Sequence, residues 1–257
     1  MIIYIMGAGR SGTTLLDIVI GNHKEAFSVG EVRKFFVFEG KPPSRDKNDN
    51  VYVFWREFYA GLSKQLKENK SIEKCAALEY HTSYPLVLFL RLFNWVPKSY
   101  CRLWRGFFKS FFDYIGSSKS MVVDSSKYPA RAMLLSMVFD DVRLVYLKRN
   151  RRDVLKSFSR KGLEQPSKSK ASAKAYHIIN GWMCGIAYGL HRNHKCVVNY
   201  EDLVHSPSDT IASILEELGV DPDPILIDNL IQGGALSTGN VFEGNRIRLN
   251  DTLAINK

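Results

Sequence analysis

A glycine-rich turn lies between the first two apolar segments of this chain of 257 residues. The first segment, Ile2–Met6, is rich in isoleucine; the turn reads GAGRSGTT, and Thr13–Ile20 has apolar residues at helical spacing. This order predicts a strand, a tight loop and a helix. The N–H groups at such a helix N-terminus bind anions because they lack acceptors within the helix. We therefore expect an α/β fold with an anion site after its first strand.

Short apolar segments alternate with helical segments along much of the remaining chain. The further strands that we expect are residues 26–29, 121–124, 143–147 and 196–200. The expected helices are residues 130–138, 151–158, 175–192 and 207–218. This alternation predicts a P-loop-like three-layer fold with a central parallel sheet of about five strands. Ligands of such sheets bind at the carboxyl ends of the strands.

Residues 40–115 interrupt this alternation with a long aromatic segment. The rings include Phe54, Trp55, Phe58, Tyr59, Phe89, Phe93, Trp95, Trp104, Phe107, Phe108, Phe111 and Phe112. Their spacing is mostly helical, so we expect most of them in the core. We predict a helical insertion over approximately 40–115 that caps the sheet and forms one wall of a substrate pocket, within a single domain of residues 1–257.

The positive charge of the chain is concentrated in one region. The formal net charge is +10, and residues 143–174 hold eleven Lys and Arg against two acids, Asp153 and Glu164. A local excess of this kind indicates one anionic ligand or one anionic face. For the second half, Lys161–Lys174, we expect a solvated loop, because that segment is rich in Lys, Ser and Ala.

The cysteines and the apolar runs exclude several other classes of protein. The four cysteines include no CxxC pair, which argues against zinc sites and disulfide frameworks and favours reduced thiols. No apolar run reaches 18 residues, and the apolar N-terminal run has no basic leader. We therefore expect no membrane span, no metal and a cytoplasmic location.

The glycine turn satisfies two known patterns. As GxGxxG it fits a dinucleotide site with Glu31 near the ribose position, but Arg10 adds a charge better suited to a terminal phosphate or sulfonate. As GxxxxG it fits a P-loop with Thr13 in place of the usual Lys, which argues against nucleotide triphosphate hydrolysis. A P-loop of this composition resembles the phosphosulfate loop of sulfotransferases, which use 3′-phosphoadenosine 5′-phosphosulfate (PAPS) without a metal. The resemblance implies cofactor binding by Gly9, Arg10, Ser11, Gly12, Thr13 and Thr14.

A second segment, RLVYLKRNRRDVLKSF, supports the same resemblance. It predicts a strand, a turn and a helix, with Asn150 as the helix N-cap and Asp153 three residues later. Arg149 ends the strand, and Ser157 lies eight residues further on. An Arg and a hydroxyl at a helix start form a pocket for a phosphate. In sulfotransferases the corresponding pair holds the 3′-phosphate of PAPS.

Two later motifs are also similar to that family. NYEDLV contains Tyr200, for which adenine contact and a core position at a strand end remain alternatives. GNRIR resembles the tail loop that closes over the cofactor, and we assign Arg246 to the 3′-phosphate with Arg248 as its competitor.

The resemblance covers residues 1–36 and 120–250 and omits the insertion. The Arg in the loop and the early acidic residue are more similar to the tyrosylprotein, carbohydrate and bacterial sulfotransferases than to the cytosolic phenol and steroid enzymes.

Sulfuryl transfer needs a general base for the acceptor hydroxyl and cations at the leaving oxygen. We assign Arg10 to the leaving oxygen and Glu31 to the base, the alternative for Glu31 being a helix N-terminal acid. The segment after the third strand has no histidine, so Lys127 or Ser126 would assist there, and we prefer Lys127 because its charge matches that of the sulfonate. For Asp124 we expect a carboxylate that orders the turn or pairs with an Arg.

Two other functions compete with this prediction. One is a P-loop kinase of small metabolites, which would need ATP and magnesium. The other is a noncatalytic protein that binds nucleic acid or a sulfated polymer through its basic segment, but it would leave the glycine turn unexplained. We therefore predict an enzyme whose partner is not nucleic acid but a hydroxyl-bearing acceptor: a sugar, a tyrosine, a lipid or a small alcohol.

Overall fold

A five-stranded parallel sheet forms the centre of the computed structural model, which describes residues 1–68, 70–159 and 169–255. The order across the sheet is β2-β3-β1-β4-β5, and each neighbouring pair is parallel. The strands are β1 (Ile2–Gly7), β2 (Ala26–Gly30), β3 (Met121–Lys127), β4 (Val142–Lys148) and β5 (Lys195–Asn199). A small antiparallel pair, β6 (Leu236–Ser237) and β7 (Thr252–Leu253), lies near the C-terminus. The predicted parallel sheet is therefore confirmed.

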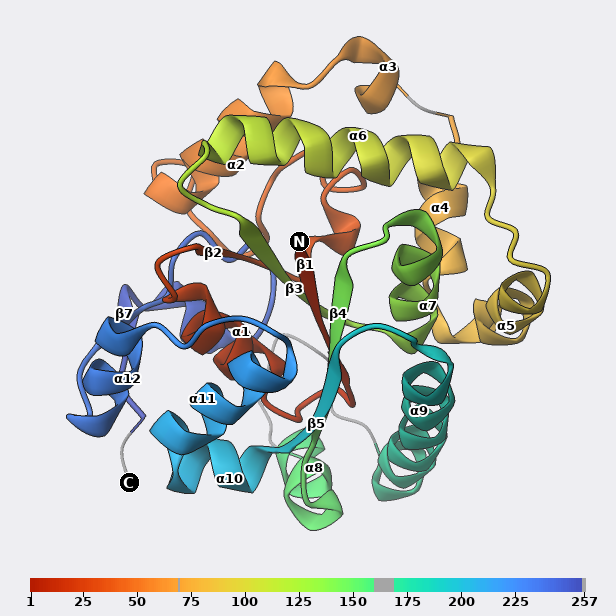
Figure 1. Cartoon of the computed structure of the whole chain (residues 1–257). Helices are drawn as coiled ribbons and strands as arrows, with labels where there is room; N and C mark the ends of the chain where they lie inside the picture. The colour runs from red at the N-terminus through yellow and green to blue at the C-terminus, as the bar shows by residue number, and fades with distance from the viewer. Residues whose placement is uncertain (69, 160–168, 256–257) are drawn as a thin grey trace.

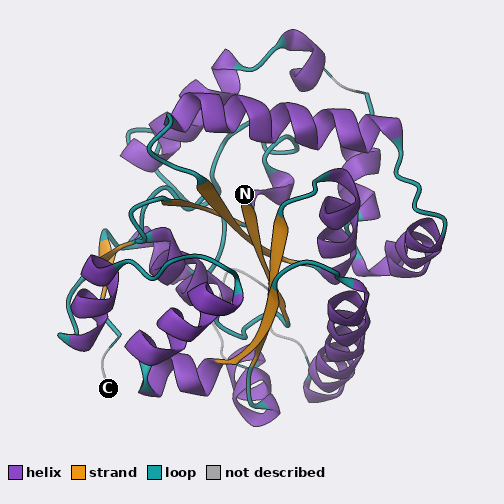
Figure 2. Ribbon diagram, in the orientation of Figure 1, coloured by secondary structure: helices purple, strands orange, loops and turns teal. Residues whose placement is uncertain are grey.

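Helices cover both faces of the sheet (Figures 1 and 2). Outside the insertion they are α1 (Thr13–Gly21), α7 (Pro129–Val138), α8 (Arg151–Phe158), α9 (Lys170–Leu190), α10 (Tyr200–His205), α11 (Pro207–Glu217) and α12 (Pro224–Ile231). Side chains alternate across a strand, so Tyr4 of β1 packs on one face while Ile3 and Ile5 pack on the other. The first face is covered by the insertion, α7 and α9, and the second by α1, α11 and α12. The three-layer prediction is confirmed.

Local sequence explains where several of these helices begin and end. The Asn150 side chain accepts a hydrogen bond of 2.9 Å from the Arg152 N–H, so it caps α8 as predicted. Pro207 begins α11 at a position where its missing N–H costs nothing. Gly219, with a φ of +65°, follows the end of that helix in the left-handed conformation.

The insertion between β2 and β3 is helical, as expected. Its elements are η1 (Val32–Lys34), α2 (Asn50–Gly61), α3 (Lys64–Lys67), α4 (Ile72–Leu78), η2 (His81–Ser83), α5 (Tyr84–Leu92) and α6 (Lys98–Ile115). Aromatic rings of α2 and α6 pack together in the core; for example, Trp55 stacks on Phe111 with ring centroids 5.3 Å apart. The core prediction is wrong for Phe89, Phe93 and Trp95, which are exposed on α5 and the turn after it.

Two predicted boundaries also differ from the structure, and one helix was not predicted. Residues 160–168 of the expected basic loop lie outside the described residues, but Lys170–Lys174 already belong to α9. Tyr200 begins α10 instead of ending a strand, because the acidic residues Glu201 and Asp202 suit a first helical turn. Helix α12 was not predicted, although its Asp223 cap and the following proline are typical start signals.

A buried carboxyl lies between the first helix and the sheet. Asp17 of α1 is fully buried, and it accepts hydrogen bonds of 2.7 Å from Ser28 and 2.6 Å from Ser125. Burial disfavours its charged form, and the nearby Asp124 adds to this, so its pKa rises from an ordinary 3.8 to about 7. The folded protein therefore holds a proton here at pH values at which the unfolded chain has lost it.

The variant Asp17→Asn should change how stability depends on pH. In the wild type the free energy of unfolding falls as pH rises from the ordinary 3.8 to about 7, because the folded state binds the extra proton. The full shift corresponds to about 4 kcal/mol, so we expect the variant to be more stable by about 1–4 kcal/mol above this range. Urea unfolding across this pH range measures the slope. The exposed control Asp209→Asn should keep the wild-type slope, and an equal slope in Asp17→Asn would contradict the assignment.

Candidate active site

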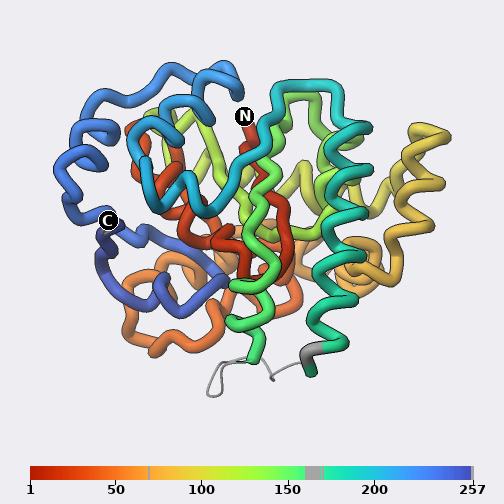
Figure 3. Tube along the Cα trace, turned by 90° about the horizontal axis from the view of Figure 1, so that it is seen from below, coloured from red at the N-terminus to blue at the C-terminus, as the bar shows by residue number. Residues whose placement is uncertain are grey.

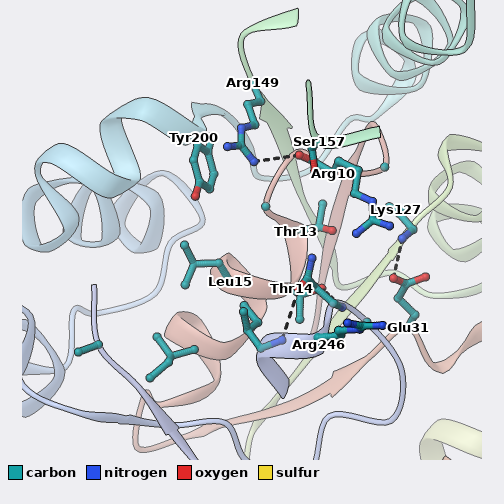
Figure 4. A pocket seen from close by; sticks show the side chains of 17 residues that line it. Arg10, Thr13, Thr14, Leu15, Glu31, Lys127, Arg149, Ser157, Tyr200 and Arg246 are labelled. Atoms are coloured by element: carbon teal, nitrogen blue, oxygen red, sulfur yellow. Dashed lines mark hydrogen bonds and ion pairs between the residues drawn. The ribbon is translucent and has the colours of Figure 1, made fainter. Parts of the chain in front are cut away.

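A cavity of about 290 Å³ lies at the carboxyl ends of the strands, where β1, β3 and β4 lead into their helices (Figure 4). Its walls combine the glycine turn, the ends of β2, β3 and β4, the start of α10 and the C-terminal segment. It is lined by Gly9, Arg10, Gly12, Thr13, Thr14, Leu15, Glu31, Lys127, Arg149, Ser157, Tyr200, Gly244, Asn245, Arg246, Ile247, Leu253 and Ala254. Distant parts of the sequence thus meet in one cavity, and most of the predicted site residues are among them.

The glycine turn is held in a cradle conformation. Arg10 and Gly12 have positive φ angles of 69° and 99°, and the Ser11 N–H donates to the Ala8 carbonyl at 3.1 Å. The N–H of Gly9 donates to the Tyr176 hydroxyl of α9 at 3.1 Å, which fixes the outer part of the turn. Helix α1 then begins at Thr13 with its first-turn N–H groups at the cavity. This arrangement is suited to binding an anion.

Arg149 links the glycine turn to the start of α10. Its Nη1 donates to the Arg10 carbonyl at 3.1 Å, and its guanidinium carbon lies 3.9 Å from the centre of the Tyr200 ring. The ring passes so close to Gly12 that a Cβ there would lie 2.3 Å from it. Tyr200 is therefore a cavity residue packed against the turn, which Figure 4 shows together with Ser157.

An ion pair lies at the end of the cavity opposite Tyr200 and Arg149 (Figure 4). The Glu31 carboxylate accepts a hydrogen bond of 2.6 Å from the Lys127 ammonium, and the Glu31 side chain is buried. Burial disfavours the charged Lys127, but the carboxylate outweighs this effect, so the pKa of Lys127 lies above its ordinary value. Lys127 is therefore held in its charged form at neutral pH.

Irregular strand pairing sets the positions of these two residues. Between Asp124 and Lys127, β3 has one residue more than the facing part of β1, and Lys127 has a φ of +61°. Between Ser28 and Gly30, β2 has one residue more than β3. Such bulges redirect the side chains that follow them. They account for the presence of Lys127 in the cavity while the neighbouring Ser126 is buried.

The C-terminal segment closes the side of the cavity next to Glu31. The N–H of Glu31 donates to the Glu243 carbonyl at 2.8 Å, and the Asn245 N–H donates to the Thr14 hydroxyl at 2.9 Å. The Glu243 carboxylate pairs with Lys34 at 2.9 Å. Sequence reasoning missed Glu243, which directly precedes the GNRIR motif, and did not single out Asn245 within that motif.

Three predicted residues do not line the cavity. Ser126 is buried, and its hydroxyl accepts a hydrogen bond of 3.3 Å from the Arg33 N–H. Arg248 is also fully buried and donates to the Pro43 carbonyl at 2.8 Å, so Arg246 is the arginine at the cavity. Ser11 lies beneath the turn, where its side chain is buried.

Asp124 and the helical insertion lie near the cavity, but within the described residues neither lines it. Asp124 pairs with Arg131 at 2.7 Å and accepts the Ser126 N–H at 2.9 Å, so it both orders the turn and pairs with an Arg, as predicted. None of the described residues of the insertion lines the cavity. The insertion approaches it through His81, whose ring lies 4.8 Å from that of Tyr128 and 5.4 Å from that of Tyr176, and through Tyr80, whose ring lies 6.0 Å from that of Tyr128.

The charges at the cavity fit a ligand with several negative charges. The lining residues include a single carboxylate, that of Glu31, and four cationic side chains: Arg10, Lys127, Arg149 and Arg246. Combined with the N–H groups of the glycine turn, these cations define an α/β protein of the P-loop-like class with an anion-binding cavity at the ends of its strands.

Comparison with known families identifies the class more closely. A model described as the sulfotransferase family matches residues 3–224 of the chain. The chain therefore belongs to the sulfotransferase family, as the resemblance of its motifs predicted. No curated protein sequence matches it significantly.

Solved structures of sulfotransferases share the fold at low sequence identity. The sulfotransferase domain from the curacin biosynthetic pathway matches with a TM-score of 0.54 and 19% identity, over 98% of this chain and 83% of that one. The sulfotransferase domain of the Synechococcus PCC 7002 olefin synthase matches with a TM-score of 0.51 and 21% identity, over 88% of this chain and 75% of that one. Sulfotransferase STF1 of Mycobacterium tuberculosis H37Rv matches with a TM-score of 0.53 and 17% identity, over 88% of this chain and 69% of that one.

The described part of the chain holds neither a cluster of metal-ligating side chains nor a membrane-spanning helix. Within residues 1–68, 70–159 and 169–255, no group of three or more His, Cys, Asp or Glu side chains is placed to hold a metal ion. In the same part of the chain, no helix combines the length and the apolar character needed to cross a bilayer.

The variant Gly12→Ala should disturb the glycine turn and displace the Tyr200 ring. The added Cβ would require a φ near +99° and would lie 2.3 Å from that ring. We expect a loss of stability of about 1–3 kcal/mol, measured by urea unfolding. Gly185→Ala is the matched control, because its Cβ meets nothing within 4 Å on the exposed side of α9. That control should be neutral or stabilising, and equal effects of the two variants would contradict the steric argument.

Proposed function

We propose that the protein transfers a sulfuryl group from PAPS to an acceptor hydroxyl, with residues 1–257 acting as one sulfotransferase domain. The observation that carries this proposal is that two groups suited to anions, the glycine turn and Arg149 with Ser157, line the same cavity as the Glu31–Lys127 ion pair. A donor with phosphate groups at both ends and a transferable group near the ion pair matches this arrangement. Membership of the sulfotransferase family supports it.

The residues present fit PAPS in the following way. The N–H groups of the glycine turn, with Thr13 and Thr14, would hold the 5′-phosphosulfate. Arg149 and Ser157, with Arg246 from the C-terminal segment, would hold the 3′-phosphate. In support, the Arg149 Nε is buried and has no hydrogen-bond partner among the described residues, so it retains a donor for an anion. The exposed part of the Tyr200 ring offers the adenine a stacking surface.

The side chains at the ion pair supply the chemistry. PAPS brings a sulfuryl group already bonded to a good leaving group, a phosphate. Glu31 accepts the proton of the acceptor hydroxyl while the acceptor oxygen forms its bond to sulfur. The bond from sulfur to the phosphate oxygen breaks, and Arg10 stabilises the negative charge that grows on that oxygen.

Lys127 has two tasks in this proposal. Its ammonium holds the Glu31 carboxylate in place at 2.6 Å, and the raised pKa of Lys127 keeps that ammonium charged. A sulfonate next to it offers the same ammonium a second anionic partner, which weakens its hold on Glu31 and frees that carboxylate to accept a proton. Binding of the donor would thus prepare the base.

The variant Glu31→Gln tests the base. We expect turnover to fall by roughly 10²–10⁴-fold while donor binding stays near the wild-type value, because the amide cannot accept the proton. The assay follows transfer of labelled sulfate from PAPS to acceptors in a lysate fraction. Glu216→Gln, at an exposed position on α11, is the control and should keep full turnover. Unchanged turnover in Glu31→Gln would remove Glu31 as the base.

Thermal unfolding with 3′-phosphoadenosine 5′-phosphate tests the donor site. At about 100 times its Kd the ligand should add about 2.7 kcal/mol of stability without any metal. Arg149→Ala should weaken binding by about tenfold or more, because it removes a charged hydrogen-bond donor. Arg152→Ala removes an equal charge from an exposed side chain nearby and should bind normally.

Other outcomes of the same experiment would favour other functions. Stabilisation only by ATP with magnesium would favour a kinase. A response only to polyanions, with steep salt dependence, would favour a noncatalytic binder.

A further inference from the structure

The outward side of α5 and the turn after it carries large apolar side chains. These are Leu86, Phe89, Leu92, Phe93 and Trp95, with exposed fractions between 49% and 73%. Positions 86, 89 and 93 are three or four residues apart, so they share one side of the helix. Helix α5 lies at the edge of the molecule in both views, away from the sheet (Figures 1 and 3). An exposed apolar group of this size marks a surface that binds something.

Helix α9 adds to this surface. It runs beside α5 in the same direction, because the Tyr84 hydroxyl donates to the Met183 carbonyl at 2.8 Å and Arg91 donates to the Leu190 carbonyl at 3.1 Å. Its exposed apolar residues are Ile178, Ile179 and Trp182, and the last of these directly precedes Met183. Ile178 lines a groove with Arg151 and Arg152 of α8, so we call the other seven exposed apolar residues of both helices and the turn the α5–α9 face.

The charge around this face has one sign. From Tyr80 to Phe112 the chain has five Lys and Arg residues and no Asp or Glu. Lys98 and Arg102 are exposed at the start of α6, which directly follows the turn that carries Trp95. The sequence of α9 also contains lysine but no acidic residue. In α5, the turn after it, the start of α6 and α9, the charged side chains are thus all cations.

We propose that the α5–α9 face docks on the surface of an anionic lipid bilayer. The Leu, Phe and Trp side chains enter the boundary between headgroups and acyl chains, and Lys98 and Arg102 contact the anionic headgroups. Tryptophan and phenylalanine at a helix surface with flanking cations are the composition that this boundary favours. The inference rests on exposure and charge, so it stands independently of the reaction proposed above.

The charge pattern selects this occupant over a second copy of the chain. A two-fold interface pairs a surface patch with itself, so a dimer through this face would bring the two cationic segments together. Like charges brought together oppose association. An anionic bilayer instead neutralises them, and it accepts apolar side chains without requiring a complementary shape.

Co-sedimentation with vesicles tests the proposal on the full chain. We expect the wild type to bind vesicles of phosphatidylcholine mixed with phosphatidylglycerol, and to bind phosphatidylcholine alone much more weakly. Phe89→Glu combined with Leu92→Glu should reduce binding by about tenfold or more. The matched control is Ile225→Glu combined with Ile231→Glu, since these positions on α12 are equally exposed and the net charge changes equally. The control should bind nearly as the wild type does.

Several results would overturn the proposal. Failure of the wild type to bind anionic vesicles would do so, as would equal binding of the two double variants. Light scattering after gel filtration gives a further check. A wild-type dimer that Phe89→Glu with Leu92→Glu converts to a monomer, with no vesicle binding, would assign the face to a second copy. We expect both variants to fold, because the substituted side chains are exposed, and thermal unfolding of each variant checks this.

Discussion

A buried arginine connects the edge of the sheet at the cavity to the helical insertion. Arg131 of α7 is fully buried and pairs with both Asp124 at the end of β3 and Glu79 beyond α4, and its guanidinium carbon lies 3.7 Å from the centre of the Trp104 ring. Removing one partner of such a group leaves a buried charge unpaired, at a cost of several kcal/mol. The end of β3 therefore cannot move independently of the insertion, and Lys127, three residues after Asp124, is held with it.

Sequence patterns predicted the sheet because each strand has a composition that no other element favours. Apolar β-branched runs, a glycine turn and helices with recognisable caps all indicated the same parallel arrangement. The helices of the insertion were harder to place. Leu86, Phe89 and Leu92 have the spacing of buried residues, yet they face outward. Spacing shows that a helix has an apolar side but does not show whether protein covers that side.

For the candidate site, the sequence predicted the residues within motifs better than those that depend on strand register. The glycine turn, Arg149 and Ser157 lie in contiguous patterns, and apart from Ser11 the residues predicted there line the cavity. The choice between Ser126 and Lys127 depended on a bulge, because one extra residue in β3 decides which side chain faces the cavity. The contacts of the C-terminal segment with Glu31 and Thr14 join residues more than two hundred positions apart, and no local pattern encodes them.

Helix α9 contacts the glycine turn at one of its ends and contributes to the outer surface further along. At its first turns the Tyr176 hydroxyl fixes the N–H of Gly9 in the glycine turn, and Trp182 lies exposed six residues later. Between and beyond them, buried residues such as Cys184 pack the helix on the sheet. The helix is a rigid element, so the direction in which the cavity opens is fixed relative to the α5–α9 face. A bilayer docked on that face would therefore meet the cavity in one orientation only.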